Sequence, residues 1–145
     1  RVVAVDPVAE RRELALRVGA DAAVEPTDAS FAASDEGPVD ISVDCAGAAA
    51  SVEFLMDHSK EAVALFGVLR DDFAYGWRHW CGHLDIVGYG RHNREAGERA
   101  LALIEDGRLD LQPIVTHTLP LSSYAEGVEL LRSKQAVKVC FLPWE

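Results

Sequence analysis

The sequence opens on Arg1-Val2-Val3-Ala4-Val5-Asp6-Pro7, a short apolar run that stops at an acid. A run of this kind, followed at once by a helical pattern, is typical of the second strand of a dinucleotide-binding β-α-β unit. The acid at the end of that strand accepts hydrogen bonds from both hydroxyls of an adenosine ribose. A glycine-rich turn for the pyrophosphate belongs about 20 residues earlier. We therefore expect the chain to be the back half of a larger protein, beginning within its cofactor domain.

The composition indicates a globular protein and excludes several classes of partner. The 145 residues are 49% hydrophobic and 26% charged, enough for one domain with a real core. The formal net charge of −10 argues against nucleic-acid or anionic membrane surfaces, where Lys and Arg should cluster. No apolar run approaches the roughly 20 residues that span a bilayer. Three scattered cysteines, Cys45, Cys81 and Cys140, predict reduced thiols in a cytoplasmic protein.

Short apolar segments alternate with amphipathic ones, which predicts a parallel sheet with crossover helices. The predicted strands cover residues 1–6, 22–24, 39–44, 61–68 and 83–88, a segment around Val115, and 136–142. We expect the strand at 61–68 to be central, because it is apolar nearly throughout. A helix over 49–58 should bury Val52, Leu55 and Met56, which recur at helical spacing. Residues 25–38 are predicted to be a loop with one turn of helix, and residues 69–82 are predicted to be irregular.

Polar residues predict where several helices begin and end. Asp6 can cap the first helix, with Pro7 in its first turn and Gly19 at its end. The pattern Ser123-x-x-Glu126 predicts a capping box at the start of the last helix. These signals support the alternation of strands and helices over the whole chain.

Six short blocks of the sequence carry a family resemblance. They are Val5-Asp6-Pro7 with Arg11 and Gly19-Ala20-Asp21; Val39-Asp40 with Asp44-Cys45-Ala46-Gly47; Phe66-Gly67-Val68; Ile86-Val87-Gly88-Tyr89; Leu109 through His117; and Val137-Lys138-Val139. In order and spacing they resemble the C-terminal half of zinc-dependent alcohol dehydrogenases of the medium-chain dehydrogenase/reductase superfamily. The resemblance implies an α/β fold: an incomplete Rossmann-type parallel sheet, lacking its first strand and glycine-rich turn, over residues 1–112. Residues 113–145 would return to the catalytic domain as its C-terminal tail.

The resemblance also implies an activity for the intact protein. It implies hydride transfer between an alcohol or polyol and NAD, in an enzyme that is a homo-oligomer. In that family the zinc ligands come from the N-terminal catalytic domain, which this sequence lacks. We therefore expect neither a catalytic residue nor a metal ligand within the chain, and no activity from the chain alone.

Two charged residues near the start are candidates for the adenosine end of the cofactor. By resemblance, Asp6 would bind the ribose, and its charge would repel a 2′-phosphate, favouring NAD over NADP. Arg11 resembles the family's basic residue beside the same ribose. The plainer interpretations are a helix cap for Asp6 and a solvated helix charge for Arg11.

Further candidates follow the later strands. Gly47 stands at the carboxyl edge of the sheet, where a residue without Cβ lets the backbone approach a ligand closely. Gly67, Val68 and Tyr89 resemble the positions whose backbone contacts the nicotinamide amide. Lys138, in an otherwise apolar strand, resembles a basic residue that reaches the pyrophosphate; the plainer alternative is a lysine that protects a sheet edge.

Residues 69–82 form an aromatic segment, with Phe73, Tyr75, Trp77 and Trp80, and two further features lie in it. His79, Cys81 and His83 alternate and have zinc-binding chemistry, yet Gly82 interrupts the strand pattern and no fourth ligand is adjacent, so we interpret them as coincidence. By resemblance the segment lies near the subunit interface and the mouth of the cofactor cleft. Trp77 and Trp80 would suit a partner surface if exposed and would fill core if buried.

Three other functions stay open. A zinc-free quinone or enoyl reductase of the same superfamily shares this half of the fold but typically uses NADPH, against which Asp6 argues. A Rossmann methyltransferase also places an acid after its second strand, although its antiparallel last strand does not suit the segment at Pro113. A non-catalytic nucleotide-sensing domain is the third.

Overall fold

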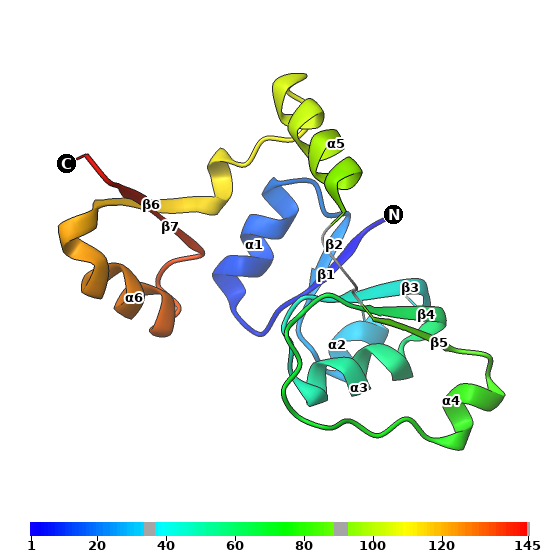
Figure 1. The fold of residues 1–145 in the computed structure, drawn as a ribbon. Helices are drawn as coiled ribbons and strands as arrows, with labels where there is room; N and C mark the ends of the chain where they lie inside the picture. Colours follow the sequence, from blue (N-terminus) through cyan, green and yellow to red (C-terminus); the bar gives the residue numbers. More distant parts are fainter. Residues whose placement is uncertain (34–36, 89–92, 145) are drawn as a thin grey trace. The chain divides into compact units, whose positions relative to one another are not determined.

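The computed structural model describes residues 1–33, 37–88 and 93–144, and strands and helices alternate along them (Figure 1). The strands are β1 (Val3–Val5), β2 (Ala22–Val24), β3 (Val39–Asp44), β4 (Ser59–Leu65), β5 (Asp85–Gly88), β6 (Val115–Pro120) and β7 (Lys138–Leu142). The helices are α1 (Ala9–Arg17), α2 (Asp28–Ala33), α3 (Ala49–Asp57), α4 (Trp77–Cys81), α5 (Arg94–Glu105) and α6 (Tyr124–Arg132), with 3-10 turns η1 (Gln112–Ile114) and η2 (Leu121–Ser123). The predicted α/β class is confirmed. Within the described residues, no helix has the length and apolar character to cross a membrane.

The chain divides into two compact units. Unit 1 comprises residues 1–4, residues 8–23 and the chain from Asn93 onward. Unit 2 comprises residues 5–7 and the chain from Val24 to the end of β5. The boundary between residues 112 and 113 stays a prediction.

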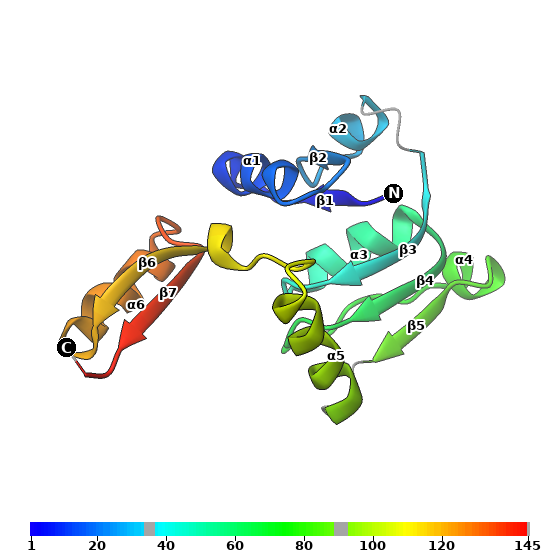
Figure 2. The ribbon, with the colours of Figure 1, turned by 90° about the horizontal axis from the view of Figure 1, so that it is seen from above.

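Unit 2 is built on a three-stranded parallel sheet in the order β3-β4-β5 (Figure 2). β4 pairs with a neighbour on each side, which confirms the prediction that it is central. α3 packs on one face, where Val52 and Met56 join Val63 and Leu84 in a buried core. Burial of each such side chain contributes about 1.5–3 kcal/mol, so this core is a main source of the unit's stability.

Unit 1 contains a parallel pair of strands, β6 with β7, and α6 connects the two strands (Figure 1). Gly127 of α6 lies against the ring of Phe141 in β7. A Cβ at Gly127 would stand 2.5 Å from the ring's Cζ, so the helix packs this closely only because the residue has no side chain. Lys138 begins β7 and pairs with Val115.

Two predicted caps are wrong. Asp6 does not cap α1: its amide donates to the Val24 carbonyl at 3.2 Å, so it continues the strand region, and the N-cap is Val8 without a side-chain bond. Ser123 is the N-cap of α6 but its side chain accepts no capping bond. Its ψ of 24°, set by the preceding η2 turn, is not the extended backbone that side-chain capping requires.

Two predicted strand boundaries also shift, and one segment predicted to be irregular contains a helix. β4 ends at Leu65 rather than continuing to residue 68, because the amides of Phe66 and Gly67 both turn to the Asp44 carbonyl. The segment 69–82, predicted irregular, contains the short helix α4. β5 begins at Asp85, since His83 has a φ of 61° and cannot extend the strand.

Candidate functional site

The carboxyl ends of β3 and β4 lie side by side in unit 2. Asp44 pairs with Leu65 at the last position of the parallel ladder. From there the turn Cys45-Ala46-Gly47 leads toward α3, and Phe66-Gly67-Val68 leaves β4. Open α/β sheets bind ligands at this edge, so the two chain segments are the first candidates for a site.

The two glycines of these segments are in contact. Gly47 has a φ of +68°, and a Cβ on it would stand 2.6 Å from the Val68 carbonyl oxygen. A Cβ on Gly67 would collide with the amide nitrogen of Gly47. The structure thus brings together three residues predicted separately, Gly47, Gly67 and Val68, and only glycine fits at the first two. Their contact with a cofactor stays a prediction.

The backbone of Val68 is accessible at this edge. Its residue surface is 78% exposed, and among the described residues neither its amide nor its carbonyl forms a hydrogen bond. The neighbouring Gly67 is already engaged, since its amide donates to the Asp44 carbonyl and its carbonyl accepts from Leu69. Val68 therefore offers one donor and one acceptor, the pair that a ligand carboxamide requires.

Four further residues were predicted for the cofactor site: Asp6, Arg11, Tyr89 and Lys138. Asp6 belongs to unit 2 and, through its bond to Val24, stands at the carboxyl end of β1. Arg11 and Lys138 belong to unit 1, whereas the glycine pair belongs to unit 2. Tyr89 lies outside the described residues. The cofactor roles of these four residues stay predictions.

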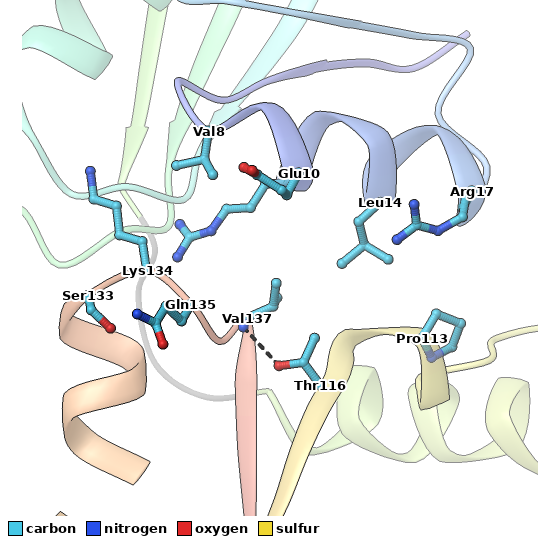
Figure 3. Close-up of a pocket in the computed structure, with 11 residues that line it drawn as sticks. Val8, Glu10, Leu14, Arg17, Pro113, Thr116, Ser133, Lys134, Gln135 and Val137 are labelled. Carbon is cyan, nitrogen blue, oxygen red and sulfur yellow. Dashed lines mark hydrogen bonds between the residues drawn. The ribbon is translucent and has the colours of Figure 1, made fainter. Parts of the chain in front are cut away.

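Unit 1 contains a cavity of about 510 Å³ (Figure 3). Arg11 is one of the residues that line it. Residues of α1 form one side, and the turn between α6 and β7 forms another. Its charged lining residues are Glu10, Arg11, Arg17 and Lys134. Three cations against one carboxylate favour an anionic ligand. Two lining residues are hydrogen-bonded to each other: the Val137 amide donates to the Thr116 hydroxyl at 3.0 Å.

The described residues include no group of three His, Cys, Asp or Glu side chains arranged to hold a metal ion. His79 and Cys81 lie on the helix α4, not on the extended chain that would align them. Both ring nitrogens of His79 are engaged: Nδ1 accepts from the Gly76 amide at 3.2 Å, and Nε2 lies 3.1 Å from Asp57 Oδ1.

The aromatic segment presents two large side chains at the surface. Trp77 and Trp80 are both exposed in α4. Because both side chains are exposed, a partner surface is favoured over core packing.

Sequence reasoning gave Asp44 no role, although it is the most buried charged residue described. A signal was present: an acid directly before a glycine-containing turn, with Ser51 in the first turn of the next helix. Local sequence does not reveal that these groups converge.

A family model described as zinc-binding dehydrogenase matches residues 18–137. The chain belongs to this family, which confirms the resemblance found in the sequence blocks. It also sets aside the methyltransferase interpretation.

Individual relatives agree with this assignment. L-threonine 3-dehydrogenase of Photorhabdus laumondii is 32% identical over 99% of this chain and 44% of its own length. Alcohol dehydrogenase TADH of Thermus sp. ATN1 has a TM-score of 0.83 at 24% identity, covering 98% of this chain and 43% of that one. A putative zinc-binding dehydrogenase of Sinorhizobium meliloti 1021, bound to NADP, has a TM-score of 0.85 at 25% identity, covering 98% and 45%. The chain therefore spans less than half the length of these proteins.

Proposed function

We propose that the chain is the cofactor-binding half of a dehydrogenase that transfers a hydride between an alcohol or polyol and NAD. One observation carries the proposal. In a chain of the zinc-binding dehydrogenase family, Gly47 and Gly67 meet at the carboxyl edge of a parallel sheet and leave the Val68 backbone accessible. The nicotinamide ring supplies the hydride chemistry when it is bound.

The residues of this chain would bind and orient the cofactor. Asp6 would accept hydrogen bonds from the adenosine ribose hydroxyls, with Arg11 nearby. Lys138 would neutralise the pyrophosphate. Val68 and Tyr89 would bond the nicotinamide carboxamide through their backbones, and so fix which face of the ring meets the substrate.

Zinc does not fit the residues described here, since no suitable cluster of ligands exists among them. In the proposed enzyme any zinc ligands lie in residues outside these 145. The same proposal makes the full-length protein a cytoplasmic homo-oligomer that acts on a small alcohol and binds neither nucleic acid nor membrane. The chain alone would not catalyse.

A second candidate is a zinc-free quinone or enoyl reductase that uses NADPH. The cationic cavity in unit 1 favours it, because Arg11, Arg17 and Lys134 would suit the extra phosphate. The NADP-bound neighbour has the same fold. The acid Asp6 at the end of β1 keeps NAD as the main proposal.

Cofactor titration and a substrate assay on the full-length protein test the choice. We expect NADH to bind more tightly than NADPH, by fluorescence, and NAD to be reduced in the presence of L-threonine or another secondary alcohol or polyol. Tighter binding of NADPH, with oxidation of NADPH by a quinone, would favour the second candidate. No binding of either nucleotide would contradict both.

A further inference from the structure

A carboxylate is buried at the end of β3, outside the set of residues that the proposed function uses. The Asp44 residue is 1% exposed. An ionised carboxylate removed from water loses several kcal/mol of solvation unless nearby donors replace the lost hydrogen bonds. The hydrogen-bond donors around Asp44 therefore decide whether its burial destabilises or stabilises the fold.

Three donors converge on this carboxylate from the chain that follows it. The Ala46 amide donates to Oδ1 at 3.2 Å, and the Gly47 amide donates to Oδ2 at 3.0 Å. The Ser51 hydroxyl, in the first turn of α3, donates to Oδ1 at 2.8 Å. Hydrogen bonds to an ionised acceptor are roughly twice as strong as neutral ones. The carboxylate thus fixes the whole connection from β3 to α3.

The main chain of the same residue holds the neighbouring segment. The Asp44 carbonyl accepts from the Phe66 amide at 2.9 Å and from the Gly67 amide at 2.8 Å. One residue therefore sets the position of both segments that form the candidate site, the first through its side chain and the second through its backbone.

The Asp44 carboxylate, Gly47 and Gly67 are closely packed. A Cβ on Gly67 would stand 2.6 Å from Asp44 Oδ2 and would also collide with the Gly47 amide nitrogen. The carboxylate, the Gly47 amide and the Gly67 α-carbon are therefore in mutual contact. A shift of the carboxylate must move the turn, and with it the surface against which Val68 lies.

We propose that Asp44 is a positioning residue for the nicotinamide end of the cofactor. By holding Gly47 against Gly67, it fixes the backbone at Val68 in the geometry that receives the carboxamide. This inference rests on the proposed function, since it assigns Asp44 a task in the same site. Asp44 itself touches no cofactor and acts only through the backbone it holds.

Two substitutions separate the charge from the hydroxyl contact. Asp44→Asn keeps the size but has one acceptor oxygen, so its amide nitrogen must face the N–H of Ala46 or Gly47. Ser51→Ala removes only the hydroxyl donor and leaves both backbone donors in place. Ser51→Thr keeps a hydroxyl and serves as the conservative rescue.

The test compares two ligands on the full-length protein. NADH spans the whole site, whereas ADP-ribose lacks the nicotinamide. In Asp44→Asn we expect NADH affinity to fall about tenfold or more, as for loss of a charge-assisted hydrogen bond, while ADP-ribose affinity is unchanged. Ser51→Ala should show the same selectivity with a smaller loss, and Ser51→Thr should restore it.

Each other outcome contradicts the assignment. Equal losses for NADH and ADP-ribose, or a lower unfolding midpoint with both affinities intact, would make Asp44 a purely structural residue. If Asp44→Asn does not fold, unchanged NADH binding in Ser51→Ala would overturn the proposal. Wild-type protein that binds NADH no more tightly than ADP-ribose would also overturn the proposal. Wild-type protein that binds neither ligand would show instead that the proposed function has failed.

Discussion

Strand β3 ends on Asp44 and strand β1 is followed directly by Asp6, and the surroundings of the two acids differ. The Asp44 carboxylate is buried and engaged by three donors of its own chain. Asp6 is only partly buried, and its amide donates to the Val24 carbonyl of β2. Burial suits Asp44 to holding the site, whereas the ligand contact of Asp6 comes from the proposed function.

The role of Asp6 predicts a change in cofactor choice. Asp6→Ala in the full-length protein should weaken NADH binding about tenfold, the loss of a charge-assisted hydrogen bond, and weaken NADPH binding much less, because a carboxylate no longer repels the 2′-phosphate. Fluorescence titration of both nucleotides measures the ratio. Asp40→Ala is the matched control, since Asp40 is exposed on β3 and its ion pair with Lys60, at 3.4 Å, lies at the surface. An unchanged NADH-to-NADPH ratio would refute the ribose contact.

Among the elements, the short helix α4 is held in place by one buried histidine. His79 accepts the Gly76 amide at its Nδ1, so its proton is on Nε2 and is donated to Asp57 at the end of α3. Its ring also stacks on Tyr75, whose hydroxyl donates to the Leu84 carbonyl at 2.6 Å. These contacts tie the aromatic segment to the core of unit 2.

This arrangement predicts unequal effects from neighbouring substitutions. His79→Phe keeps an aromatic ring but loses both hydrogen bonds, and it should lower the free energy of unfolding by about 1–3 kcal/mol. Arg78→Ala removes a bond to the same Asp57, yet that pair is solvent-exposed and should contribute about 0–1 kcal/mol. Urea denaturation of the full-length variants measures both. A larger loss from Arg78→Ala would show that the surface ion pair, not the buried ring, holds α4.

At the scale of the whole molecule, the described residues of unit 2 place a packed helix on one face of its sheet and exposed apolar side chains on the other. α3 packs over Val63, whereas Ile41, Val43 and Val87 on the opposite face are 60%, 56% and 53% exposed. The last two share a face because both pair with Ala64. Parallel sheets are normally buried on both faces, so this apolar surface calls for a covering layer.

The uncovered face predicts how the isolated 145-residue chain behaves. We expect it to self-associate despite its net negative charge, and the double variant Ile41→Lys/Val87→Lys should reduce the association. Leu121→Lys, at a residue of unit 1 that is 52% exposed, is the control and should change little. Light scattering across a concentration series measures this. A wild-type chain that is monomeric and unfolds cooperatively would contradict the prediction.

Much of the fold could be predicted because the signals are local. Strands over 22–24 and 39–44 have the predicted limits, and α3 buries Val52 and Met56 as their spacing indicates. The family, too, was recognisable from short blocks that keep their order. Helix caps were less predictable: Asp6 and Ser123 have suitable side chains, but the backbone at each position is set by the preceding element.

The sequence by itself determined the alternation of strands and helices, the family and the glycines of the candidate site. Only the tertiary structure decided that Gly47 and Gly67 touch, and that Asp44 joins their two segments. The physical reason is distance along the chain. Periodicity and capping act over a few residues, whereas the groups that meet at Asp44 come from two strands and a helix and converge only when the parallel sheet forms.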